Sequence, residues 1–249
     1  MADFDTRYAR GAGVARPGTA AADIDQGLRS YMLQVYNYMA TGLAVTGVAA
    51  LGAFLLAVQN GQLTDFGALL YTSPLRWVVM LAPLGMVFFL SARIGKMSVS
   101  AAQMAFWVFS ALMGLSLSSI FLVYTGTSIT RVFFITAASF GALSLYGYTT
   151  KKDLSGWGSF LFMGLIGIII ASVVNLFLAS SALQFAVSVI GVLVFAGLTA
   201  YDTQRIKEMY YAGDLAEVMG RKAIMGALSL YLNFINMFMM LLSLFGNRE

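Results

Sequence analysis

The sequence has 249 residues but contains no cysteine, no histidine and only three prolines. Without cysteine, disulfides, thiolate catalysis, covalent haem attachment and iron–sulfur clusters are excluded. Without histidine, no imidazole transfers protons near neutral pH and no histidine ligates a metal. Charge is scarce as well, because charged residues make up 10% of the chain whereas an average soluble domain carries about 25%. This composition excludes a soluble globular enzyme and a disordered chain.

What the chain has in abundance is apolar sequence, with 59% hydrophobic residues and a mean hydropathy of +0.81. Its 25 glycines suit closely packed membrane helices. Seven apolar stretches each approach the roughly 20 residues that cross a bilayer. They lie at about 32–58, 76–94, 99–124, 131–149, 157–178, 182–203 and 223–245. The sequence therefore predicts an all-α integral membrane protein with seven transmembrane helices, and a six-span arrangement is the alternative.

The apolar stretches are helices rather than barrel strands, because runs such as 160–171 are continuously apolar. Strands of a membrane barrel alternate apolar and polar residues over about ten positions. We expect one transmembrane domain over residues 31–249. Residues 1–30 are polar and are expected to form a disordered cytoplasmic tail.

The distribution of lysine and arginine predicts the orientation. Twelve of the fifteen basic residues fall in the tail and in the second, fourth and sixth links, and three fall on the opposite side. This alternation fits seven spans with the N-terminus in the cytoplasm and the C-terminus outside. With six spans, the basic links would be divided between the two sides of the membrane. The formal net charge of +4 is therefore read as a topology signal, and no nucleic-acid partner is expected.

Few ionisable residues lie within the spans, and such residues are candidates for function. Asp202 lies where the sixth span meets the cytoplasm, shortly before Arg205 and Lys207. It is either a helix-end aspartate paired with one of these cations or an inward carboxylate that binds cations or titrates. Arg93 closes the second span and reads as a topology charge, unless it turns inward to meet a carboxylate. Asn233, in the last span, is expected to form a hydrogen bond between helices.

Catalytic motifs are missing from the sequence. It contains no phosphate-binding loop, no nucleophile elbow and no His-Glu-x-x-His zinc motif. An intramembrane aspartyl protease needs two facing aspartates, and the spans offer only Asp202. We expect no enzymatic activity, no catalytic residues and no cofactor.

Two segments carry a family resemblance. Residues 199–208 read Thr-Ala-Tyr-Asp-Thr-Gln-Arg-Ile-Lys-Glu, and residues 227–246 form the apolar last span with Leu-Tyr-Leu-Asn-Phe. With segments 83–93 and 141–155, they make the chain resemble the Bax inhibitor-1 (transmembrane Bax inhibitor motif) family, in particular its bacterial branch. The resemblance implies a multi-pass protein of the inner (plasma) membrane, with six helices around a central seventh.

The resemblance also implies functions. These are a pH-sensitive calcium leak in some members, cytoprotection in eukaryotic relatives, and regulation of a membrane-bound AAA protease in one bacterial branch. Our first hypothesis is a calcium (cation) leak pathway through the bundle beside Asp202, in which calcium is the transported ion. The alternative is a non-transporting regulator in the bilayer that binds such a protease or another stress-response partner, with the tail as contact surface.

The family's pH sensor is a pair of buried aspartates with an arginine partner. Asp202 matches the first aspartate, Asn233 stands where many members have the second, and Arg93 maps to the arginine. An acidic residue common about ten positions earlier is Pro83 here. We therefore expect Asp202 to be ionised at neutral pH, held by the Asn233 amide and a basic neighbour. Calcium should bind Asp202 weakly, since one carboxylate falls short of its usual oxygen ligands, and gating should lie at lower pH than in relatives with two aspartates.

Overall fold

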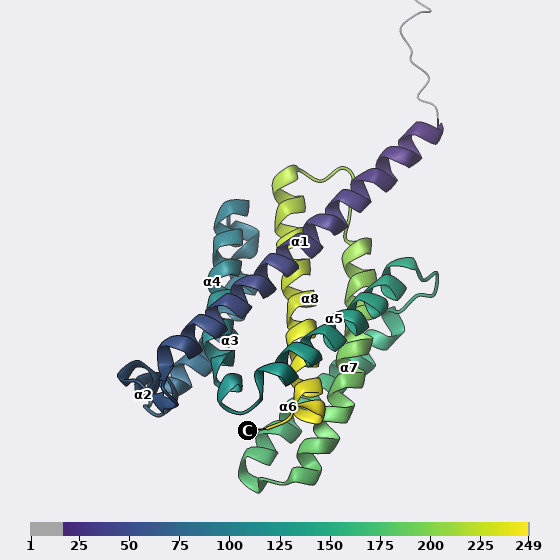
Figure 1. Cartoon of the computed structure of the whole chain (residues 1–249). Coiled ribbons are helices and arrows are strands. Elements are labelled where there is room, and N and C mark those ends of the chain that lie inside the picture. Colours follow the sequence, from purple (N-terminus) through teal and green to yellow (C-terminus); the bar gives the residue numbers. More distant parts are fainter. Residues whose placement is uncertain (1–16, 249) are drawn as a thin grey trace, which may run out of the picture.

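The computed structural model describes residues 17–248, and long helices dominate this part of the chain (Figure 1). Seven of the described helices are long and apolar enough to cross a membrane. They are α1 (Pro17–Ala57), α3 (Leu75–Arg93), α4 (Val99–Leu117), α5 (Gly126–Thr149), α6 (Ser155–Leu178), α7 (Ser181–Glu208) and α8 (Ala216–Phe245). Short 3₁₀ turns, η1 (Ile94–Lys96) and η2 (Ser118–Leu122), continue α3 and α4. The all-α fold and the seven spans are confirmed.

Helix α1 begins earlier than the sequence suggests. It starts at Pro17, and its membrane-spanning part runs from Gln26 to Ala57, so residues 17–30 of the expected tail are helical. Proline is suited to a first helical turn, because the N–H group that it lacks would be unpaired there. The remainder of the predicted tail, residues 1–16, lies outside the described residues.

The link between the first two spans has structure that we did not predict. A two-residue hairpin pairs β1 (Val58–Gln59) with β2 (Gln62–Leu63) across Asn60 and Gly61, which both have positive φ. Helix α2 (Asp65–Tyr71) follows, and the Thr64 hydroxyl accepts a hydrogen bond from the Gly67 N–H at 3.1 Å to cap it. This link is therefore a compact cap on one end of the α1–α4 side of the bundle.

Helix α8 is the most buried of the seven spans, and it packs against α1, α4, α5 and α7. In Figure 1, α1 crosses the bundle obliquely in front of α8, with α4 on one side and α7 on the other. Helix α3 packs mainly on α4, and α6 packs mainly on α7. The expected ring of six helices around the seventh is therefore not confirmed, since α8 has four principal neighbours.

The outer position of α3 and α6 follows from their sequences. Helix α6 is apolar around its whole circumference, and side chains such as Phe162 and Ile170 are exposed, as is Phe88 on α3. In a bilayer these faces contact lipid chains at no cost. The small residues of α6 face α7, where a Cβ at Gly158 or Gly164 would collide with Tyr201 or Val194, so its other faces are left to the lipid.

Close approach between the inner helices depends on glycine at two places. A Cβ at Gly147 on α5 would collide with the backbone carbonyl of Ala200 on α7, and one at Gly114 on α4 would collide with the backbone of α1. Such small-residue contacts let membrane helices gain dispersion energy from their backbones. Gly147 thus lets α5 approach α7 closely next to the Asp202 segment, and Gly114 does the same for α4 and α1.

The orientation of the seven spans across the membrane stays a prediction. Reporter fusions after residues 152 and 180 check the orientation, because these positions lie in successive links and must report opposite sides.

Asp153 lies in the link between α5 and α6, where hydrogen bonds from the side chain and backbone of Ser155 hold the pKa of its carboxyl below the usual value.

Candidate functional site

The buried carboxylate of Asp202 marks the candidate site. Asp202 lies six residues before the end of α7, about 9 Å along the helix axis, and 8% of its surface is exposed. Its Oδ2 atom accepts a hydrogen bond from Asn233 Nδ2 at 2.7 Å and another from Ser229 Oγ at 3.0 Å. Ser229 and Asn233 are one turn apart on α8 and present both donors to α7.

Asp202 also borders a cavity of about 140 Å³ between α7 and α8. The cavity is lined by Asp202, Arg205, Ile206, Met209, Met225, Gly226 and Ser229. The carboxylate therefore has two hydrogen-bond donors and an adjoining accessible space, which the donor Ser229 also lines. An inward carboxylate beside a small cavity is the second of the two alternatives that the sequence left open.

The first alternative, a pair with a following cation, is not what the structure has. Between residues 17 and 248, neither Arg205 nor Lys207 forms an ion pair with Asp202. Arg205 is exposed, at the wall of the cavity. Lys207 Nζ instead donates to the backbone carbonyl of Tyr148 at 2.9 Å.

The structure does not bring Arg93 to Asp202. Arg93 is the last residue of α3, its side chain is exposed, and among the described residues it makes no hydrogen bond or ion pair with Asp202. The reason is the position of α3, which packs on α4 at the outside of the bundle. An arginine at the end of an outer helix reaches the headgroup region without entering the protein.

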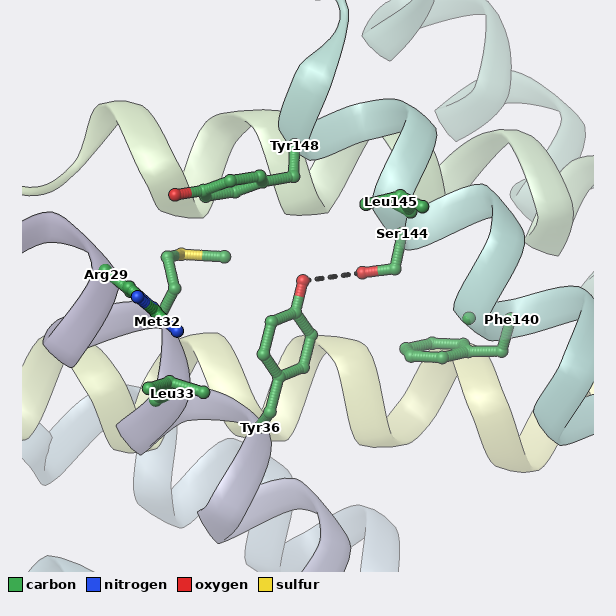
Figure 2. A pocket seen from close by; sticks show the side chains of 9 residues that line it. Arg29, Met32, Leu33, Tyr36, Phe140, Ser144, Leu145 and Tyr148 are labelled. Carbon is green, nitrogen blue, oxygen red and sulfur yellow. Dashed lines mark hydrogen bonds between the residues drawn. The ribbon is translucent and has the colours of Figure 1, made fainter. Parts of the chain in front are cut away.

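A chain of hydroxyl groups that we did not predict from the sequence adjoins the site. The Tyr36 hydroxyl of α1 is 2.7 Å from Ser144 Oγ of α5 (Figure 2). Ser144 Oγ is in turn 3.0 Å from Thr203 Oγ1 of α7. Thr203 Oγ1 in turn donates to the Thr199 carbonyl at 2.7 Å. The chain joins three spans next to Asp202. Its one signal in the sequence is the position of Thr203 directly after the aspartate.

Gln204 is the other missed residue of the motif at 199–208. Its Oε1 atom accepts from the Leu154 N–H at 2.8 Å, and its Nε2 atom donates to the Lys152 carbonyl at 2.8 Å. The side chain thus fastens the α5–α6 link to α7. Successive residues of the motif therefore bind different parts of the molecule: Asp202 binds α8, Thr203 binds α5, and Gln204 binds the link.

The site offers one carboxylate and two hydrogen-bond donors. Within residues 17–248, no group of three or more acidic, histidine or cysteine side chains is placed to hold a metal ion. Calcium takes six to eight oxygen ligands in its usual sites, so Asp202 and Ser229 would supply a small part of such a set. The arrangement suits transient contact with a cation and a charge-dependent link between α7 and α8.

Comparison with known sequences agrees with the motif and the fold. Residues 28–249 match the family described as "Inhibitor of apoptosis-promoting Bax1". The chain belongs to the Bax inhibitor-1 family. This match covers nearly all of the described structure and confirms the resemblance seen at the motif.

Bacterial relatives in this family are similar over most of their length. The inner membrane protein YbhL of Escherichia coli is 50% identical over 226 residues, which cover 90% of this chain and 94% of the relative. A protein of Rickettsia prowazekii is 50% identical over 225 residues, which cover 90% of this chain and 92% of the relative. A membrane protein of Streptococcus pyogenes is 34% identical over 225 residues, which cover 90% of this chain and 96% of the relative. The bacterial Bax inhibitor-1 family protein described here is thus a multi-pass protein of the inner membrane.

Proposed function

We propose that this Bax inhibitor-1 family protein is a passive cation pathway, with calcium as the ion carried, and that Asp202 controls its opening. The observation that carries the proposal is the 2.7 Å hydrogen bond from Asn233 to the buried Asp202 carboxylate. Ionisable groups at such depth are costly and mark ion pathways or proton-sensitive elements. Here the group joins the two helices between which an ion would pass.

The interface between α7 and α8 has an accessible space at each end. The small cavity at Asp202 lies at one end. At the other, a cavity of about 540 Å³ is lined by polar side chains including Asn175, Gln184, Ser188 and Ser243. Asp202 and Ser188 are 14 residues apart on α7, about 21 Å along the axis. The two cavities are candidates for the two mouths of the pathway.

Along the stretch between these cavities, both helices carry buried apolar side chains. They are Val194, Phe195 and Leu198 on α7 and Met237 and Phe238 on α8. A hydrophobic constriction of this kind blocks ions by excluding water. Under this proposal, the described conformation is the closed state of the pathway.

Opening requires α7 and α8 to separate, and the charge of Asp202 opposes that separation. Protonation removes the charge that accepts hydrogen bonds from Asn233 and Ser229, so acid weakens the contact between the helices. With an amide rather than a second carboxylate opposite Asp202, ionisation meets no like charge. We therefore expect opening at lower pH than in relatives with two facing aspartates.

Calcium flux into liposomes that contain only this protein tests the proposal. We expect flux to rise as pH falls, Asp202→Asn to abolish the pH dependence, and Asn233→Asp to move the transition to higher pH. The control is Asn236→Asp, because the Asn236 side chain donates to the Leu232 carbonyl of its own helix. Its pH profile should match that of the unmodified protein. Identical profiles for the unmodified protein and Asn233→Asp would contradict the role of this pair.

A second candidate function is a non-transporting regulator that binds a membrane-bound AAA protease or another stress-response partner. It is favoured by the first turns of α1, which project beyond the other helices in Figure 1 and offer a contact surface. Flux no higher than in empty vesicles at any pH would favour this candidate.

A further inference from the structure

A cavity of about 500 Å³ lies between α1 and α5, away from the α7–α8 contact. Its lining residues are Arg29, Met32, Leu33, Tyr36, Phe140, Gly141, Ser144, Leu145 and Tyr148, eight of which are labelled in Figure 2. Helices α1 and α5 both pack against α8 but hardly against each other. The hydrogen bond between Tyr36 and Ser144 bridges the space between them.

The cavity faces the surrounding membrane. Leu33 and Leu145 line it and are 52% and 63% exposed, on spans whose outer faces contact lipid. Most of the wall is aliphatic, thioether or aromatic carbon. Such a wall offers water few hydrogen bonds and suits a hydrocarbon chain.

One end of the cavity carries cationic and hydroxyl groups. Arg29 lies near the start of the first span, while Tyr148 and Lys207 lie near the ends of α5 and α7, at the side predicted to be cytoplasmic. The Lys207 ammonium is 5.3 Å from the centre of the Tyr148 ring. The nine lining residues include Arg29 and no acidic residue. A phosphate at this end would meet positive charge and donors, since arginine binds phosphate through parallel N–H groups.

We propose that this cavity binds an anionic phospholipid. Its phosphate lies at Arg29 and the Tyr148 hydroxyl, and an acyl chain lies along Leu33, Phe140 and Leu145. Basic pockets between transmembrane helices on the cytoplasmic side are known to take anionic headgroups. The charge at one end and the apolar wall along the rest match the two halves of a single lipid molecule.

Native mass spectrometry of the full chain tests the proposal, with phosphatidylglycerol and phosphatidylcholine of identical chains as the probes. We expect phosphatidylglycerol to be retained in preference to phosphatidylcholine. Arg29→Gln should lower phosphatidylglycerol retention about fivefold, the effect of one basic residue near an anionic headgroup. Leu145→Trp fills the apolar wall and should lower retention of both lipids.

Matched controls lie on α5 outside the cavity. Arg131→Gln removes a charge near the opposite end of α5, and Phe134→Trp enlarges an exposed side chain that does not line the cavity. Both variants should retain the lipids as the unmodified protein does. Equal retention of the two lipids, or a preference that survives Arg29→Gln, would overturn headgroup recognition. Retention unchanged in Leu145→Trp would overturn the site. No calcium flux is measured, so the result is independent of the proposed function.

Discussion

The hydrogen bond between Asn233 and Asp202 should contribute measurably to the stability of the bundle. Both side chains are buried, with 5% and 8% of their surfaces exposed, and the donor and acceptor atoms are 2.7 Å apart. A hydrogen bond to a charged group contributes about 1.5–3 kcal/mol. Polar contacts between membrane helices average about 0.6 kcal/mol, with a maximum of about 1.7 kcal/mol. Since the carboxylate is charged but keeps its bond from Ser229, we expect a coupling energy of about 1.5 kcal/mol.

A double-mutant cycle of Asn233→Ala and Asp202→Ala measures this coupling. The free energy of unfolding is followed in mixed micelles as the fraction of denaturing detergent rises, with the fluorescence of the three tryptophans as the signal. The matched cycle uses Asn236→Ala, whose amide donates to Leu232 O of its own helix at 2.8 Å. That cycle should give a coupling below about 0.5 kcal/mol. If the two cycles give the same coupling energy, the Asp202–Asn233 bond does not join α7 to α8 in the way described.

Two further predictions concern packing and hydroxyl groups. Gly147→Ala should lower the midpoint of thermal unfolding in detergent, because the added methyl meets the α7 backbone. Gly141→Ala has open space and gains helix propensity of up to about 1 kcal/mol, so its midpoint should not fall. A lower midpoint for Gly141→Ala than for Gly147→Ala would contradict the close approach of α5 and α7. Tyr231→Phe loses the 2.6 Å hydrogen bond to Thr46 and should cost about 0.6 kcal/mol, at most about 1.7. Tyr31→Phe should leave the stability unchanged in the same assay, since the Tyr31 hydroxyl has no hydrogen-bond partner among the described residues. A loss of stability as large as that of Tyr231→Phe would contradict the difference between the two hydroxyls.

The spans could be predicted because their signal is local. A run of about 20 apolar residues fixes a membrane helix whatever its neighbours are, and the observed ends lie within a few residues of the expected ones for most spans. The neighbours of each helix could not be predicted in this way. The outer place of α3, and with it the exposure of Arg93, depends on which faces of seven helices meet.

The candidate site was predictable only in part. That Asp202 and Asn233 meet, 31 residues apart in sequence, followed from the family resemblance and not from a pattern in the residues themselves. Ser229 had a local signal, because it precedes Asn233 by one helical turn and so shares its face. The β1–β2 hairpin also had a local sequence signal, because the Asn60-Gly61 pair favours two-residue turns.

The chain of hydroxyls between α1 and α7 has a fixed direction. Each hydroxyl has a single proton to donate, and that of Thr203 is used by the Thr199 carbonyl, which can only accept. Ser144 must therefore donate to Thr203, and Tyr36 must donate to Ser144. The Tyr36 oxygen consequently faces the α1–α5 cavity with lone pairs alone, while Arg29 at the mouth offers only N–H groups. An anionic group of a guest molecule is therefore favoured at Arg29 and disfavoured beside the Tyr36 oxygen, which gives an amphipathic guest one orientation in the cavity.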